Sequence, residues 1–230
     1  MLMKIYDALL DLYGHQGWWP VTPTCTTEKR PMYGVATRTE KQKFEVILGA
    51  ILTQNTSWKN VEKAITNMWE HDLVDRKHLE KMSAEEIAPF IRSAGYFNQK
   101  AKKIKAFLAY NGLMTREGLL SIWGLGPETV DSILLYAYKE PQFVVDAYTR
   151  RMFSEYGLIA HDASYDDIKE FFEENIKTEL QRAAASGRSS ELQKELVQIY
   201  NEYHALIVAH GKEFYSKRPY GRNDPIKKVL

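Results

Sequence analysis

The sequence lacks three features that would narrow its function at once: several cysteines, a charge excess and a long hydrophobic run. The single cysteine, Cys25, excludes an internal disulfide and any metal cluster held by several thiolates of this chain. The formal net charge is +1, so composition gives no reason to expect nucleic acid, and that case must rest on local motifs. No apolar stretch approaches the roughly 20 residues of a membrane helix. Because Lys4, Asp7 and Asp11 interrupt the apolar start, it is unlike a signal peptide, and we expect a cytoplasmic protein without a membrane partner.

Apolar residues recur at helical spacing through nearly the whole chain, which predicts an all-α fold. A polar cluster at residues 53–57 is expected to separate two helices, and Ser83-Ala-Glu-Glu86 has the pattern of a capping box. The polar tail after Lys217 is expected to be loosely held. The predicted helices cover Met1–Tyr13, Lys41–Trp69 with its break, 83 to 94, Asn98–Tyr110, Thr115–Ile122, Pro127–Tyr138, Asp146–Tyr156, Ser164–Ala185 and Ser190–Phe214.

A tight turn, Gly124-Leu-Gly126, joins two of these predicted helices. Pro127 then takes the first helical position, where its missing N–H does no harm. The glycines permit a tight turn and a close approach of another backbone, and the exposed N–H groups of the new helix form an anion site. A DNA phosphate would fit that site without a lysine, while Leu125 would plug the hairpin into the core. Taken alone, the pattern is more typical of an ordinary helical hairpin.

A carboxylate, Asp146, follows 20 residues after Gly126, and Arg150 and Arg151 come one turn later. In isolation such a residue is most often a plain helix N-cap. It would also suit cleavage of an N-glycosidic bond, because a fixed carboxylate stabilises the positive charge that develops on the sugar. The same group can position or deprotonate the attacking water.

Together these motifs resemble the endonuclease III superfamily of helix-hairpin-helix DNA glycosylases. Ile122-Trp-Gly-Leu-Gly126 occupies the place of that family's Leu-Pro-Gly-Val-Gly-like hairpin, and Val145-Asp146-Ala147 that of its Val-Asp-Thr-like aspartate. Leu52-Thr-Gln-Asn-Thr56 matches the family's Leu-(Ser/Thr)-x-Gln-x-Thr sequence. The similarity extends from about Phe44 to Gly211.

The resemblance implies roles for particular residues. Asp146 would be catalytic, and Gln54 would enter the gap left by a flipped base, although a polar residue at a helix end is the alternative for Gln54. The residues expected to bind DNA at the hairpin are Gly124, Leu125, Gly126 and Thr129.

The family fold also implies two packed helical lobes. Residues 39–138 would form a six-helix barrel lobe with the hairpin at 115–138. Residues 1–38 and 139–230 would form the second lobe, which carries Asp146, with the DNA cleft between them. The expected partner is double-stranded DNA containing a damaged base, bound by a monomer that associates with the nucleoid in a prokaryote.

One position separates the two mechanisms of the family. Members that also cut the strand form a Schiff base through a lysine two residues after the second hairpin glycine. Glu128 stands there, and a carboxylate cannot form an imine, so the sequence indicates a monofunctional enzyme that uses water. Glu128 also complements the helix dipole, which explains it without reference to chemistry.

No cofactor is expected. The family's four cysteines are absent from the segment His210–Tyr220, so it cannot hold the iron–sulfur cluster. A cation at the hairpin that bridges to a DNA phosphate is compatible with the motif.

Within the superfamily, the chain is most similar to the Helicobacter-type 3-methyladenine DNA glycosylase branch. Trp18 or Trp19 would sandwich the flipped base with Phe44, and aromatic faces attract the positive charge of an alkylated purine. Core packing is the alternative for each of these rings. Lys212 matches a pocket lysine of this branch that can be carbamylated, although a C-terminal lysine is usually solvated. The motifs that carry the likeness are Trp18-Trp-Pro20, residues 44–56, Gly95–Lys102, Val144-Val-Asp146 and His210-Gly-Lys212.

Two rival functions are compatible with the sequence. The first rival is a bifunctional glycosylase and lyase with a relocated amine such as Lys212, acting on oxidised or other damaged bases. The second is a hairpin module that binds DNA without catalysis. The basic residues Lys100, Lys102, Lys103 and Lys105 of one helix are expected to form a solvated face, with phosphate contact as the alternative.

Overall fold

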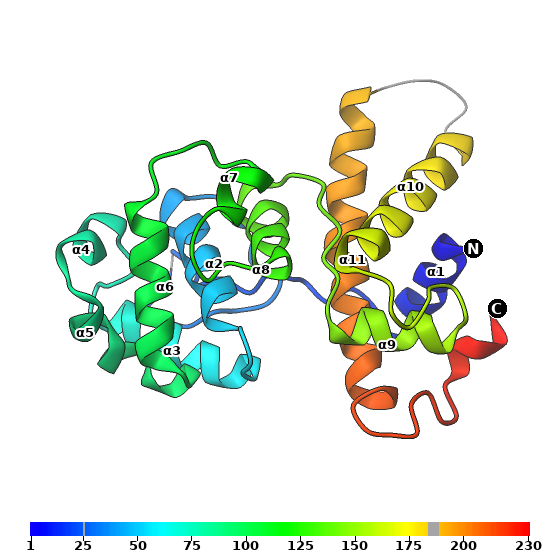
Figure 1. The fold of residues 1–230 in the computed structure, drawn as a ribbon, viewed down its shortest axis with the longest axis horizontal. Helices are drawn as coiled ribbons and strands as arrows, with labels where there is room; N and C mark the ends of the chain where they lie inside the picture. The colour runs from blue at the N-terminus through cyan, green and yellow to red at the C-terminus, as the bar shows by residue number, and fades with distance from the viewer. Residues whose placement is uncertain (25, 184–188) are drawn as a thin grey trace. The chain divides into compact units, whose positions relative to one another are not determined.

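The computed structural model describes residues 1–24, 26–183 and 189–230, and the regular elements of this part of the chain are all helices (Figure 1). Its one β-type pairing is an isolated antiparallel bridge between Val21 and Met32. The prediction of an all-α fold is confirmed. Cys25 and the last residues of the helix predicted to end at Ala185 lie outside the described residues. Within the described ranges, no helix combines the length and the apolar character that crossing a membrane requires.

The chain divides into two compact units, which we name by what they contain. The hairpin unit is Trp19–Lys139, and the terminal unit joins Met1–Trp18 to Glu140–Leu230. The first boundary between the units is predicted after residue 38, whereas in the structure it follows Trp18. The segment after Trp19 joins the hairpin unit because Val21 pairs with Met32 and the backbone N–H of Thr22 donates to Glu45 at 2.9 Å.

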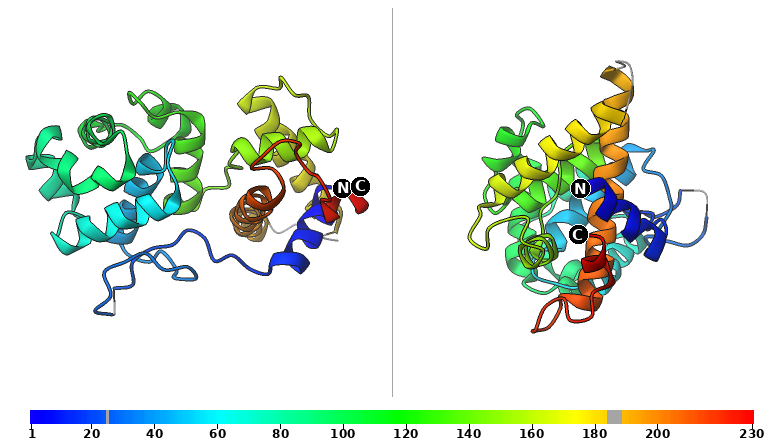
Figure 2. Two further views of the ribbon diagram at one scale, coloured as in Figure 1. Left: turned by 90° about the horizontal axis from the view of Figure 1, so that it is seen from below. Right: turned by 90° about the vertical axis from the view of Figure 1, so that its right-hand side faces the viewer.

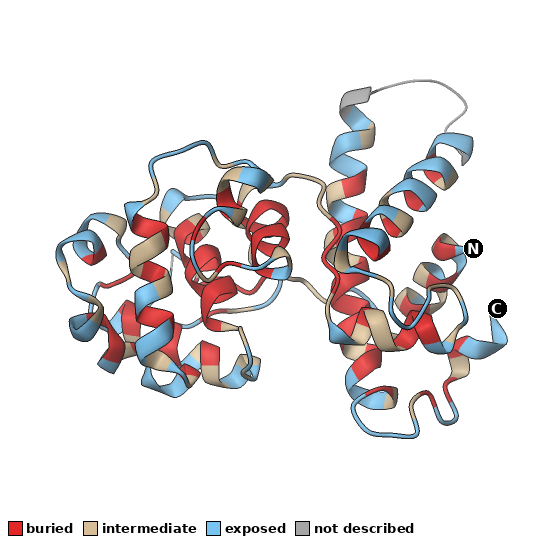
Figure 3. Cartoon of the chain, viewed as in Figure 1, coloured by how far each residue is buried: buried red, intermediate tan, exposed pale blue. Residues whose placement is uncertain are grey.

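The hairpin unit packs its helices around one buried helix. Helix α2 is buried at every residue from Phe44 to Leu52, and the π-helical segment η2, which packs against it, is buried from Ile133 to Ala137 (Figure 3). The elements are α2 (Glu40–Leu52), α3 (Trp58–Glu70), α4 (Arg76–Lys81), α5 (Ala84–Ile87), the 3-10 helix η1 (Ala88–Ala94), α6 (Phe97–Ala109), α7 (Arg116–Leu120), α8 (Pro127–Ser132) and η2 (Ile133–Tyr138).

Most of the predicted helices are present, with informative differences at their ends. The break at residues 53–57 and the capping box of Ser83 and Glu86 are confirmed. The predicted single helix from Pro127 to Tyr138 is wrong in its second half, where α8 gives way to the π-helical turns of η2. Local sequence does not show this change because a π-helix keeps the same apolar pattern over so few residues.

The terminal unit is built from both ends of the chain, and α1 packs against α10 and α11 (Figure 2). Its core is aromatic: the rings of Phe143 and Phe172 stack at 4.1 Å, and Tyr203 meets both rings edge-on. The elements are α1 (Leu2–Tyr13), α9 (Ala147–Glu155), α10 (Tyr165–Ala183), α11 (Ser189–Phe214) and the 3-10 helix η3 (Pro225–Lys228).

The C-terminal tail is not loosely held, and that prediction is wrong. Asp224 is 5% exposed, and its carboxylate accepts hydrogen bonds from the hydroxyls of Tyr215 at 2.6 Å and Tyr156 at 2.7 Å. It also accepts from Nε2 of His210 at 2.9 Å and from the backbone N–H of Ile226 at 2.8 Å. This buried polar network fixes the C-terminal segment around Asp224 in place.

The prediction of a solvated basic face on α6 is also wrong for three of its four lysines. Lys100 is 2% exposed, and its ammonium donates to the carbonyls of Leu52 at 2.8 Å and Ala94 at 2.7 Å, so that it caps the end of α2. Burial, with the charge of Lys103, lowers the pKa of Lys100 to about 8. Lys103 and Lys105 are part-buried and bond to other elements, which leaves Lys102 exposed.

Candidate functional site

The predicted hairpin forms between α7 and α8, and its turn is open on one side. Gly124 has φ +85°, and a Cβ there would lie 2.7 Å from Cγ of Lys103, so this position requires glycine on two counts. At Gly126 an added Cβ would meet nothing within 4 Å. Leu125 is 6% exposed and packs into the unit as predicted. The backbone N–H groups of Gly124 and Gly126 make no hydrogen bond within the described ranges, so they are available to an anion.

Gln54 lies two residues after α2 and is bonded to this hairpin. Its side-chain amide donates to the carbonyl of Gly124 at 3.2 Å and to the hydroxyl of Thr129 at 3.0 Å. Its amide oxygen accepts from the ammonium of Lys103. The structure thus brings together three of the residues expected to contact DNA, and it adds Lys103, which sequence reasoning placed on a solvated face.

Asp146 is the N-cap of α9, as predicted. Its Oδ1 accepts hydrogen bonds from the backbone N–H of Thr149 at 2.7 Å and from the Thr149 hydroxyl at 2.8 Å, and the backbone N–H of Asp146 closes a capping box with Thr149. Both bonds converge on one carboxylate oxygen. Within the described part of the chain, Oδ2 has no hydrogen-bond partner, so the carboxylate is oriented by its cap and keeps one oxygen available.

A buried histidine that sequence reasoning missed stands near this carboxylate. His204 of α11 is 5% exposed, and the ring of Trp18 meets its imidazole edge-on at 5.6 Å. Burial lowers the pKa of His204, and the negative charge of Asp146 works against that shift. The side-chain amide of Asn201 donates a hydrogen bond of 3.0 Å to the backbone carbonyl of Trp18. His204 therefore lies close to both Trp18 and Asp146 within the terminal unit.

Trp19 and Phe44 belong to the hairpin unit and are largely covered, each 6% exposed. Trp19 packs edge-on against Trp58 at 5.2 Å and tilted against Tyr136 at 4.9 Å. A Cβ on Gly49 of α2 would lie 3.1 Å from the Trp19 indole nitrogen, so the ring lies directly on that helix. The base-pocket role of both aromatic residues stays a prediction.

Lys212 lies in the last turn of α11 and is exposed. Its neighbour Gly211 makes a close helix–helix contact, because a Cβ there would lie 2.4 Å from Cγ of Tyr148 on α9. The pocket role and the carbamylation of Lys212 stay predictions. Glu128 is exposed at the second position of α8, where the resemblance would place the lysine of a strand-cutting enzyme.

The described residues contain no group of three or more His, Cys, Asp or Glu side chains arranged to hold a metal ion. The hairpin unit contains the hairpin with Gln54, and the terminal unit contains Asp146 with Trp18 and His204.

Comparison with known proteins assigns these features to one family. Residues 48–178 match the model of the HhH-GPD superfamily of base excision DNA repair proteins. The chain is 42% identical over 243 residues to a protein of Methanocaldococcus jannaschii that is named as a DNA repair glycosylase, covering 99% of this chain and 94% of that one. It is 27% identical over 186 residues to endonuclease III of Sulfolobus acidocaldarius, covering 76% of this chain and 75% of that one.

Solved structures show the same fold. A crystal structure of H. pylori 3-methyladenine DNA glycosylase bound to 1,N6-ethenoadenine matches with a TM-score of 0.68 at 27% identity, covering 91% of this chain and 96% of that one. A non-covalent endonuclease III–DNA complex matches with a TM-score of 0.67 at 16% identity, covering 100% of this chain and 93% of that one.

Proposed function

Because the chain belongs to the HhH-GPD superfamily of base excision DNA repair proteins, it is a DNA glycosylase, and we propose that it releases alkylated purines of the 3-methyladenine type without cutting the strand. The observation that carries this proposal is the geometry of Asp146, a carboxylate held through Oδ1 by its own capping box. The cap fixes its direction and leaves Oδ2 for chemistry.

The reaction that suits this carboxylate is hydrolysis at C1′ of the deoxyribose. As the N-glycosidic bond breaks, the base leaves with the bonding electrons and the sugar becomes cationic. The charge of Asp146 stabilises that cation more than it stabilises the neutral sugar of the substrate. Water then bonds to C1′, and Oδ2 accepts the proton that the water loses.

The monofunctional part of the proposal rests on Glu128. A lyase needs an amine to attack C1′ and form an imine, and the side chain at this position of α8 is a carboxylate. The resemblance of the segment to endonuclease III therefore extends to the hairpin and the aspartate but not to the nucleophile.

The choice of alkylated purine rests on charge and on a partial sequence likeness. A 3-alkylated purine is cationic, and its glycosidic bond is already weakened, so it needs little protonation of the leaving base. The proposed contact is the half-buried ring of Trp18, an aromatic face that attracts cations. The H. pylori protein of solved structure, which is 27% identical to this chain, is named a 3-methyladenine DNA glycosylase, and this name agrees with the choice. The proposal includes no metal or organic cofactor, and it places the enzyme on damaged duplex DNA as a monomer.

The experiment is a base-release panel on duplexes that contain methylated purines, oxidised bases or uracil. We expect release of 3-methyladenine, and we expect the Asp146→Asn variant to bind the same duplex while releasing no base. An exposed carboxylate outside the site gives the matched control, Asp162→Asn, which should retain activity. Release of oxidised bases or uracil alone would overturn the substrate, and a covalent adduct after borohydride treatment of abasic DNA would overturn the monofunctional mechanism. Base release by the Asp146→Asn variant at the wild-type rate would remove the catalytic role of Asp146.

A further inference from the structure

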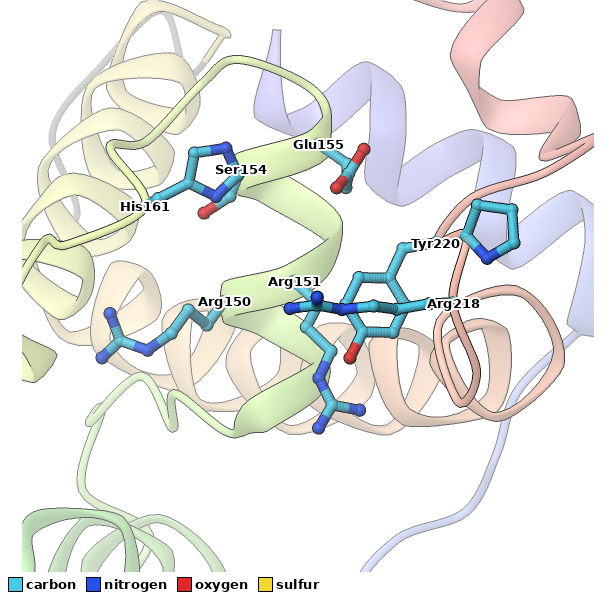
Figure 4. A pocket seen from close by; sticks show the side chains of 8 residues that line it. Arg150, Arg151, Ser154, Glu155, His161, Arg218 and Tyr220 are labelled. Carbon is cyan, nitrogen blue, oxygen red and sulfur yellow. The ribbon is translucent and has the colours of Figure 1, made fainter.

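The terminal unit contains a cationic pocket of about 510 Å³ that has no part in the proposed hydrolysis (Figure 4). It is lined by Arg150, Arg151 and Ser154 of α9, by His161 in the loop that follows, and by Arg218 and Tyr220 of the C-terminal segment. Figure 4 shows His161 on the side of Ser154, Tyr220 beside Arg151 and Arg218, and the Arg150 side chain extending away from the Tyr220 ring. The volume is within the range of about 300–1,000 Å³ that is typical of ligand pockets.

The guanidinium groups are held in place by neutral partners. Arg150 donates to the carbonyl of Ala163, and Nη1 of Arg151 donates to the carbonyl of Tyr215 at 3.1 Å. The guanidinium carbons of Arg151 and Arg218 lie 5.2 Å and 5.6 Å from the centre of the Tyr220 ring. Carbonyls and an aromatic ring orient these cations without cancelling their charge.

The pocket is also poorly neutralised. In the described ranges, none of the three arginines forms an ion pair with a carboxylate, and Glu155 is the one acidic side chain on the wall. With three arginines and one glutamate, the lining carries an excess of positive charge. Arginines in this arrangement suit an oxyanion, because the guanidinium fork can donate two parallel hydrogen bonds to it.

A second observation points to the same kind of ligand. The hydroxyl of Ser154, a residue that is 7% exposed, has no hydrogen-bond partner among the residues that the structure describes. A buried hydroxyl without a partner costs free energy, so its retention on a pocket wall needs an explanation. An oxyanion in the pocket would accept the hydrogen bond that this hydroxyl can donate.

The pocket lies on the helix that Asp146 caps. Arg150 and Arg151 follow Asp146 by four and five residues, which corresponds to about 6–8 Å along the axis of α9. The backbones of both arginines therefore lie about one helical turn from Asp146, on the same element.

We infer that this pocket binds a phosphate group of the DNA strand and forms a second phosphate site besides the hairpin. The inference rests on the proposed function for the identity of its ligand. The chemistry alone, a tetrahedral oxyanion held by arginines and a serine hydroxyl, is shared with free phosphate, and the test separates the two sources.

The test measures binding of a fluorescently labelled duplex at salt concentrations from about 50 to about 200 mM. Arg218 is exposed, so Arg218→Gln should fold normally, and we expect about tenfold weaker binding and a log–log salt slope smaller by about 0.9. Arg222→Gln removes the same charge from a nearby exposed residue outside the pocket, and we expect an unchanged slope. Ser154→Ala should weaken binding less than Arg218→Gln while leaving the melting temperature equal or higher.

Equal slopes for the wild type, Arg218→Gln and Arg222→Gln would overturn the inference. So would a pocket that binds only inorganic phosphate, seen as phosphate-dependent NMR shifts that Arg218→Gln abolishes while the DNA slope stays the same. Base release is measured in parallel to separate this inference from the proposed function. A smaller slope for Arg218→Gln without base release by the wild type would support the phosphate pocket and contradict the proposed function. Normal base release with equal slopes would support the proposed function and contradict the phosphate pocket.

Discussion

The buried carboxylate of Asp224 gives the sharpest test of how the terminal unit is stabilised. Burial would raise its pKa, but the hydrogen bonds from His210, Tyr215 and Tyr156 outweigh burial and lower the pKa from 3.8 to about 2. A difference of that size means that the folded state favours the ionised form by about 2 kcal/mol. Replacing the carboxylate by an amide removes the charge and leaves buried donors without a good acceptor, so we expect Asp224→Asn to cost about 3 kcal/mol.

For a chain of this size, 1 kcal/mol corresponds to about 2–4 °C in melting temperature, so the variant should melt about 6–12 °C lower. Thermal unfolding followed by circular dichroism at pH 7 measures this, and the exposed acid in Asp162→Asn is the matched control. A melting temperature of Asp224→Asn within about 1 °C of that control would refute the role given to the network.

The same residue predicts a pH dependence. Because the folded-state pKa is depressed, the stabilisation is fully present above the unfolded value of 3.8 and is lost as pH falls through about 2. The wild type should therefore lose stability across this window more steeply than Asp224→Asn. Parallel acid titration curves for the two proteins would contradict the assignment.

Two further predictions concern the hairpin unit. Gly124→Ala should destabilise the protein by about 1–2 kcal/mol because of the positive φ and the contact with Lys103, whereas Gly126→Ala should change stability by less than about 1 kcal/mol yet weaken DNA binding. Equal DNA affinity for Gly126→Ala and the wild type would rule out phosphate approach at that glycine. Burial raises the pKa of Glu45 to about 7 against the hydrogen bonds from Thr22 and Trp69, so stability should fall as pH rises from about 4.5 to about 7. Chemical unfolding across that window should show the fall in the wild type, and Glu45→Gln should flatten it.

The helices and caps could be predicted because their signals are local. The capping box of Ser83 and Glu86, the N-cap of Asp146 and the plug formed by Leu125 each depend on residues a few positions apart. Apolar periodicity then sets which face of a helix is buried, since that face must meet another element. The same reasoning could not show where α8 becomes π-helical.

The buried charges could not be predicted because their partners are distant in sequence. Lys100 bonds to the carbonyl of Leu52, 48 residues away, and Glu45 bonds to Thr22, 23 residues away. Sequence patterns assign such residues to solvent, because a charge is rarely buried without a partner and the partner is invisible until the chain is folded. The arginine pocket has the same origin, since Arg151 and Arg218 come from segments that meet only in the folded terminal unit.

Gln54 shows how the folded structure changes the meaning of a predicted site residue. The resemblance makes it a residue that enters DNA, yet its amide is bonded to Gly124 and Thr129, which are 70 and 75 residues away. If Gln54 enters DNA as the resemblance implies, we expect insertion to break these bonds. Each such bond contributes about 1 kcal/mol net. The predicted phosphate contact of the hairpin is made by the same turn that holds Gln54, and for insertion to be favourable the DNA must replace the bonds that Gln54 gives up. If both predicted roles hold, phosphate binding at the hairpin and insertion of Gln54 are coupled through Gly124, and in the free protein the bonds to Gly124 and Thr129 orient the Gln54 side chain.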